Sequence, residues 1–99
     1  MKIVVVTRYP AIVQHLYRQG VIDDSVIVLP IVKREDIEGC HVIGVLPVHL
    51  AAHAESVTIQ HIFPPRGFDW SQLTLEDVEM YSRAPVTYQV RRIDTPIPF

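Results

Sequence analysis

The stretch "HVIGVLPVHLAAHA", residues 41–54, decides the fold that this sequence predicts. It opens with an apolar strand pattern over 41–45 and runs through Pro47 into a helix that ends near Ala54. Gly44 lets backbone or a ligand approach closely, and a proline suits the first position of a helix, where its missing N–H costs nothing. A strand that turns directly into a helix is the unit from which parallel α/β sheets are built.

The segments before and after this stretch continue the alternation. The runs "KIVVVT" (2–7) and "SVIVLP" (25–30) are continuously apolar, as in strands that are covered on both faces. Between them, Ile12 and Leu16 share one face of a helix expected over 11–20. The later segments are a charged connector over 33–39, an alternating strand over 56–63, a loop over 64–72, a capping-box helix over 74–83 and a closing strand over 86–92. This order predicts a small Rossmann-like α/β domain, with a mainly parallel sheet of about five strands and helices on both faces.

The composition limits the partners. The 99 residues carry a formal net charge of −2, so no global field attracts nucleic acid, and any phosphate contact must come from a few arginines. The single cysteine, Cys40, excludes an internal disulfide and fits a reducing cytoplasm, where it would fill a small apolar space. The apolar run at the N-terminus is too short for a signal peptide or a membrane span. We therefore expect one cytoplasmic domain over 1–99, with a Pro-rich tail over 93–99, that binds neither membranes nor DNA.

The expected ligand site lies at the carboxyl edge of the sheet. In open parallel sheets, ligands bind beyond the carboxyl ends of the strands, where the first N–H groups of helices are free. Three loops leave such ends: the first carries Thr7, Arg8 and Tyr9, the second follows Gly44 with Leu46, Pro47, Val48 and His49, and the third carries Arg66 and Gly67. Arg8 and Arg66 would form charge-assisted hydrogen bonds with phosphate oxygens, although both are equally compatible with ordinary surface arginines. Together the loops predict a pocket for an anionic ligand.

Other chemistries have less support in the sequence. His49 and His53 have the spacing of a metal-ligand pair on a helix, but no third ligand is evident, so neither a metal nor a cofactor is expected. No G-x-G-x-x-G, Walker loop, C-x-x-C pair or nucleophile elbow is present, which disfavours dinucleotide and ATP chemistry. Phe68 and Trp70 either stack a base or cap the core or a dimer contact. The remaining histidines, expected at the surface or at an interface, are His15, His41 and His61.

Three stretches in order along the chain resemble one known family. "VVVTRYP" (4–10), "HVIGVLPVHLAAHAE" (41–55), and "PPRG" (64–67) followed by "LT" resemble the CRISPR-associated Csx-sixteen family of type III systems. The central stretch is the most specific of the three. The sequence departs from the family pattern in its first loop, where Tyr9 and Ala11 replace a histidine and the glycine after it, so no role for that histidine carries over. "EGCH" before the third strand lacks the family's glycine–aspartate pair, and the tail from Arg92 onward has no counterpart.

The resemblance implies a ring nuclease. Such proteins degrade cyclic oligoadenylates and work as homodimers of a Rossmann-like fold similar to CARF sensor domains. For this chain we expect cyclic tetra-adenylate as the ligand. RNA cleaves itself when a ribose 2′-OH lies in line with the neighbouring phosphate, so no metal is required. Arg8, Arg66 and the amides after Leu46 would stabilise charge, and His49 is the expected acid or base. Two alternatives remain open: a sensor or sequestering protein that binds a cyclic nucleotide without cleaving it, and an adaptor whose Pro-rich tail binds a protein.

Overall fold

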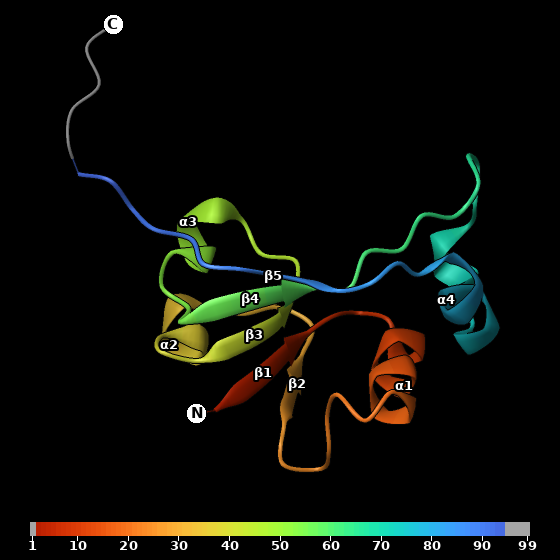
Figure 1. Cartoon of the computed structure of the whole chain (residues 1–99), viewed down its shortest axis with the longest axis horizontal. Helices are drawn as coiled ribbons and strands as arrows, with labels where there is room; N and C mark the ends of the chain where they lie inside the picture. The colour runs from red at the N-terminus through yellow and green to blue at the C-terminus, as the bar shows by residue number, and fades with distance from the viewer. Residues whose placement is uncertain (1, 95–99) are drawn as a thin grey trace, which may run out of the picture.

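The computed structural model describes residues 2–94 and contains one five-stranded sheet with helices on both faces (Figure 1). The elements in chain order are β1 (Ile3–Val6), α1 (Pro10–Arg18), β2 (Ile27–Leu29), α2 (Arg34–Ile37), β3 (His41–Gly44), α3 (Val48–Ala51), β4 (Ser56–Ile59), the 3-10 helix η1 (Trp70–Gln72), α4 (Leu75–Tyr81) and β5 (Val86–Tyr88). The strand order is β2-β1-β3-β4-β5; β2, β1, β3 and β4 are parallel, and β5 is antiparallel to β4. The predicted Rossmann-like α/β class is therefore confirmed. Of the expected tail over 93–99, residues 95–99 lie outside the described part of the chain.

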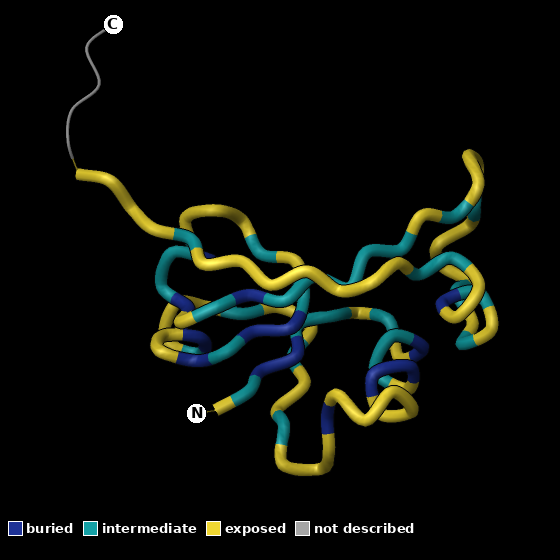
Figure 2. The backbone as a smooth tube through the Cα atoms, in the orientation of Figure 1, coloured by how far each residue is buried: buried dark blue, intermediate teal, exposed yellow. Residues whose placement is uncertain are grey.

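Each face of the sheet has its own apolar cluster. On one face, Val4 and Val42 pack with Ile37 of α2 and Ala51 of α3, and Cys40 fills a buried apolar place beside them, as expected. On the other face, Val5 of β1 and Ile43 of β3 pack against Leu16 of α1. Figure 2 shows that the buried backbone is concentrated in the central strands and in the helix faces turned toward them. Burial of apolar residues on both sides of β1 and β3 explains why their sequences are continuously apolar rather than alternating.

The glycine at the end of β3 is required by the sheet itself. Gly44 has a φ of +146°, and a Cβ at this position would lie 2.3 Å from the carbonyl oxygen of Val6 on the neighbouring β1. Of the two readings that the sequence left open for this glycine, the structure shows the close approach of backbone. Any larger residue would push β1 and β3 apart.

Three elements are much shorter than the sequence predicted. The closing strand expected over 86–92 ends at Tyr88. The helix expected from Pro47 to Ala54 is a single turn, Val48–Ala51. Pro47 is its N-cap residue rather than its first helical residue. The strand expected over 56–63 ends at Ile59. Beyond that point the chain stays extended but leaves the sheet, because residues 61–63 pair with the segment after α4: the N–H of Arg83 donates to the His61 carbonyl at 2.9 Å, and Ile62 forms an isolated bridge with Ser82. An alternating pattern therefore continued past the end of the ladder.

Helices α1 and α4 pack side by side near the carboxyl edge of the sheet (Figure 1). Arg18 of α1 forms a 3.0 Å salt bridge with Glu79 of α4. The capping box expected at the start of α4 is present, since Thr74 Oγ1 accepts from the Asp77 N–H and Asp77 accepts from the Thr74 N–H. His15 is only 6% exposed, so its expected place at the surface is wrong; it shares the buried face of α1 with Ala11, four residues earlier.

No helix in the described part of the chain is long and apolar enough to cross a bilayer.

Candidate ligand-binding site at the carboxyl edge of the sheet

The strand order creates a crevice between β1 and β3. The chain passes from β1 to β2 on one side and then returns to place β3 on the other side of β1. In doubly wound sheets, ligands bind outside the carboxyl ends of the strands at the point where the order reverses in this way. A pocket of about 510 Å³ lies at this point, lined by residues that follow β1, β3 and β4, by α1 and by Trp70. The strand order and the position of the pocket thus indicate the same candidate site, between the carboxyl ends of β1 and β3.

The loop after β1 presents Arg8 to the pocket. The Thr7 N–H donates to the Leu29 carbonyl at 3.1 Å, and the Thr7 hydroxyl accepts from the Tyr9 N–H at 3.1 Å. These two bonds shape the turn that carries Arg8. Thr7, Arg8 and Tyr9 all line the pocket, and among the described residues no carboxylate forms a salt bridge with Arg8. Its guanidinium is therefore available to an anionic ligand.

The first turn of α1 adds to the attraction for an anion. The helix begins at Pro10, its N-cap residue Tyr9 makes no side-chain capping bond, and no acidic residue occurs in its first turn. The partial positive charge of a helix N-terminus is usually offset by such groups. Because Tyr9 and Ile12 line the pocket, the uncompensated start of α1 faces the same space as Arg8. What this start offers an anion is the partial charge of the helix dipole, because Pro10 has no N–H and the Ile12 N–H donates to the Tyr9 carbonyl at 3.0 Å.

The chain after β4 supplies a histidine that the sequence did not place here. Gln60 and His61 line the pocket, because β4 ends at Ile59 rather than at residue 63. The His61 ring is stacked on Phe63 at a centroid distance of 5.8 Å, and the Arg83 guanidinium lies 5.9 Å from the centroid of Phe63. The Gln60 side-chain amide donates to the Arg83 carbonyl, which fixes the two segments together. The sequence could have indicated this position of His61 only through the end of β4 at Ile59. The alternation of polar and apolar residues continues past that point.

An aromatic wall closes one side of the pocket. Trp70, 39% exposed, lies 5.9 Å from Tyr9 and 5.8 Å from Phe68 between ring centroids, and Phe68 in turn contacts Tyr81 of α4. Asp69 holds η1 in place by accepting hydrogen bonds from the Ser71 hydroxyl at 2.6 Å and the Ser71 N–H at 3.0 Å. The same bonds, first the one from the side chain and then the one from the backbone, lower the pKa of Asp69 from its ordinary value. Trp70 thus packs against Tyr9 and Phe68 and lines the pocket while partly exposed.

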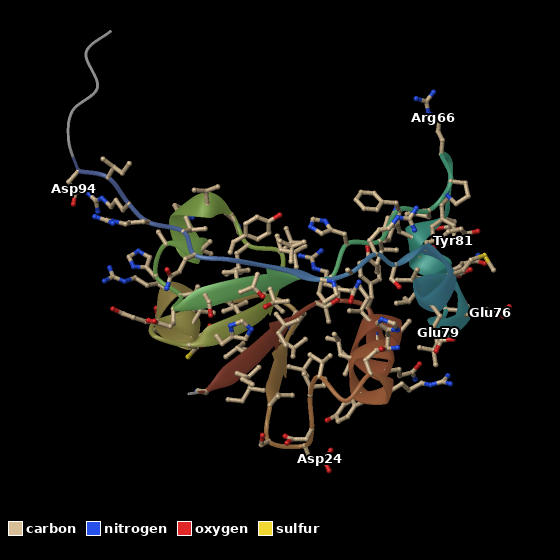
Figure 3. The ribbon with its side chains drawn as sticks, in the orientation of Figure 1. Asp24, Arg66, Glu76, Glu79, Tyr81 and Asp94 are labelled. Atoms are coloured by element: carbon tan, nitrogen blue, oxygen red, sulfur yellow. The ribbon has the colours of Figure 1, made fainter. Side chains whose placement is uncertain are left out.

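The structure does not bring all the predicted site residues together. Gly44 lines the pocket with Thr7, Arg8 and Tyr9, but Leu46 packs against the apolar cluster on the opposite face of the sheet. Val48 and His49 belong to α3, and Pro47 is the N-cap residue of this helix. α3 lies beside α2 (Figure 1), and Val48 and His49 line a different pocket. Arg66 and Gly67 lie on an exposed loop, and Figure 3 shows the Arg66 side chain pointing away from the sheet. Within one chain, the carboxyl-edge pocket therefore holds the first predicted loop and Gly44, and their roles in binding stay predictions.

In the described part of the chain, no group of three or more His, Cys, Asp or Glu side chains is arranged to hold a metal ion. His49 and His53 both line the second pocket, but the expected helical pair is not formed, because α3 ends at Ala51 and His53 lies in the turn after it.

Fold and pocket define a small doubly wound α/β protein with a crevice at its topological switch point. Residues 4–91 match the family model described as "Putative CRISPR-associated protein (Cas_VVA1548)", and the chain belongs to this family. No curated protein matches the chain. No solved structure matches it either.

Proposed function

We propose that the protein is a cytoplasmic ring nuclease that binds cyclic oligoadenylate at the carboxyl-edge pocket and cleaves it without a metal. Cyclic tetra-adenylate is the proposed preferred substrate. Membership of a CRISPR-associated family supports a role in antiviral defence. The observation that carries the proposal is the meeting of Arg8, the uncompensated start of α1 and His61 around one pocket. These groups are the ones that a phosphodiester cleavage needs: charge to stabilise phosphate oxygens and a side chain that moves a proton.

The proposed reaction is an internal transfer within the RNA. The ribose 2′-oxygen attacks the adjacent phosphorus and gives up its proton to a base, while the bond from phosphorus to the 5′-oxygen breaks and that oxygen receives a proton. The products are a 2′,3′-cyclic phosphate and a free 5′-hydroxyl. Arg8 and the partial positive charge at the start of α1 would stabilise the charge on the non-bridging oxygens, and His61 would transfer a proton. Tyr9 and Trp70 would stack an adenine.

A homodimer fits both the ligand and the edge of the sheet. A pocket of about 510 Å³ lies in the size range of small-molecule sites, and two copies around a two-fold axis would match a ring with the same symmetry. β5 is an edge strand whose three residues are all exposed, including Val86 and Tyr88. An exposed edge strand presents unpaired backbone groups to a second copy.

A sensor that binds the ring without cleaving it is the second candidate. It is favoured by the scarcity of proton-transfer groups, because His61 is the single histidine that lines this pocket among the described residues. His49 lies in the other pocket of the same chain, and as the acid or base of the reaction it is the alternative to His61.

The test is incubation of the protein with cyclic tri-, tetra- and hexa-adenylate in the presence of EDTA, with separation of the products by chromatography. Binding is followed in parallel by the fluorescence of Trp70, the only tryptophan of the chain. The proposal predicts quenching of Trp70 and linear products with a 2′,3′-cyclic phosphate. Quenching without products would establish the sensor, and neither signal with any of the three rings would overturn both candidates.

A further inference from the structure

A second pocket, of about 710 Å³, shares no lining residue with the carboxyl-edge pocket. Three separate segments form it: the start of α2, the turn of α3 with the residues after it, and the chain that follows β5. Five of its nine lining residues are arginine or histidine, against twelve in the whole chain of 99. These five are Arg34, His49, His53, Arg91 and Arg92. Three of the nine lysine and arginine side chains of the chain thus line one pocket.

Two contacts hold the segment that carries Arg91 and Arg92 near α3. Val90 packs against the apolar cluster that contains Ala51, and the Gln89 side chain donates to the Glu55 carbonyl at 3.5 Å. These contacts hold the segment after β5 near α3, and Arg91 and Arg92 follow it directly at the pocket. The position of Arg34 follows from α2, whose Ile37 is fully buried.

No carboxylate lines this pocket among the residues that the structure describes. Two acidic side chains lie outside it: Glu38 is 3.6 Å from Arg34, and Asp94 is 2.6 Å from Arg92. All four partners of these pairs are more than half exposed, and exposed ion pairs contribute little to stability. A bound anion can therefore replace the carboxylates at small cost. Arg91 forms no salt bridge within the described chain.

The residue types that line the pocket indicate which class of ligand it would bind. Each arginine offers five N–H donors, so three arginines offer more than a single phosphate group can accept. The lining also lacks Phe, Tyr and Trp side chains among the described residues, so it provides no platform on which a base could stack. We propose that this pocket binds two or more adjacent phosphate groups through charge alone, as in the backbone of a single-stranded oligoribonucleotide. The site is separate from the proposed cleavage site and does not depend on it.

The test uses a fluorescein-labelled single-stranded oligoribonucleotide of about twelve nucleotides, within the range that single-strand sites cover. Its binding to the full chain is measured by anisotropy at several salt concentrations. For single strands, log K falls with log salt by about 0.7 per phosphate neutralised, so three arginines predict a slope of roughly −2. Arg91→Ala should weaken binding about tenfold at low salt and bring the slope to roughly −1.4.

Arg18→Ala is the matched control, because it removes the same charge from α1, and Arg18 lines neither pocket. It should leave both the affinity and the slope unchanged. Circular dichroism checks that each variant is folded. Since the labelled oligoribonucleotide is linear, a failure of this test leaves the proposal of ring cleavage untouched.

Inorganic pyrophosphate as a competitor identifies the source of the phosphates. Displacement of the probe by pyrophosphate would show that a diphosphate group suffices, and no displacement would show that a longer phosphodiester backbone is needed. Either result supports a site for adjacent phosphates. The proposal is overturned if the wild-type protein does not bind the oligoribonucleotide, or if Arg91→Ala and Arg18→Ala have the same affinity and slope.

Discussion

Replacement of Gly44 by alanine tests whether the corner after β3 is built for the sheet. The added Cβ would lie 2.3 Å from the Val6 carbonyl oxygen, whereas carbon and oxygen atoms of neighbouring strands normally approach to about 3.3 Å. The two central strands would have to separate by roughly 1 Å, which costs at least one ladder hydrogen bond, about 1 kcal/mol. The backbone angle of Gly44 adds about 1–3 kcal/mol of strain for an L-residue.

We therefore expect Gly44→Ala to lower the free energy of unfolding by about 2–4 kcal/mol. Gly20→Ala is the control, because Gly20 has a φ of +70° and no non-neighbouring atom of the described chain lies within 4 Å of an added Cβ. It should cost only about 1–2 kcal/mol for its backbone conformation. Urea unfolding, followed by circular dichroism, should separate the two midpoints by roughly 1–2 M. Equal midpoints for the two variants would refute the steric account of Gly44.

The remaining predictions concern assembly, metals and pH. Light scattering at tens of micromolar should give twice the chain mass of 11.3 kDa, and the mass of one chain would contradict the proposed dimer. EDTA should leave cleavage unchanged, and a loss of activity that a divalent ion restores would contradict a metal-independent reaction. Because hydrogen bonds from Ser71 lower the pKa of Asp69 in the folded state, the charged form stabilises η1 at every pH above the ordinary Asp value, and this stabilisation is lost as the pH falls through the lower folded value. The difference in Trp70 emission between the wild type and Asp69→Asn should therefore stay constant from about pH 7 to about pH 5 and shrink only below about pH 4. A change in this difference already above pH 5 would contradict the role of Asp69.

The central strands were predictable from sequence because both of their faces are buried. A strand such as β1 or β3 that packs apolar residues on two sides has a continuously β-branched sequence, and the topology then follows from the short connections. The capping box at the start of α4 was predictable because it is a local pattern. The place of Cys40 in the core followed from its residue type.

The arrangement of the candidate site was less predictable, because it depends on where strands end. Residues 60–63 continue the alternating pattern of β4, yet they pair with the chain after α4 through contacts distant in sequence, such as Ile62 with Ser82. That early end brings Gln60 and His61 into the pocket, whereas Arg66 lies on an outer loop. His49 was expected at the same edge, but its single helical turn packs beside α2. The sequence could have indicated the burial of His15, since Ala11 and His15 lie four residues apart on one face of α1. In the structure α4 packs against α1.

The central claim is that cleavage occurs in the pocket of Arg8 and His61. Arg8→Ala should weaken binding of cyclic tetra-adenylate and slow its cleavage together, by roughly 10- to 150-fold, because a charge-assisted bond of about 1.5–3 kcal/mol stabilises ground and transition states alike.

The most direct measurement is the single-turnover cleavage rate of His61→Ala, at protein concentrations that Trp70 fluorescence shows to be saturating. The account predicts that the ring still binds while the rate falls by about 10²–10⁴-fold, and that Arg18→Ala, changed outside both pockets, cleaves at the wild-type rate. A full rate in His61→Ala together with a loss in His49→Ala would contradict the account and place the chemistry in the other pocket.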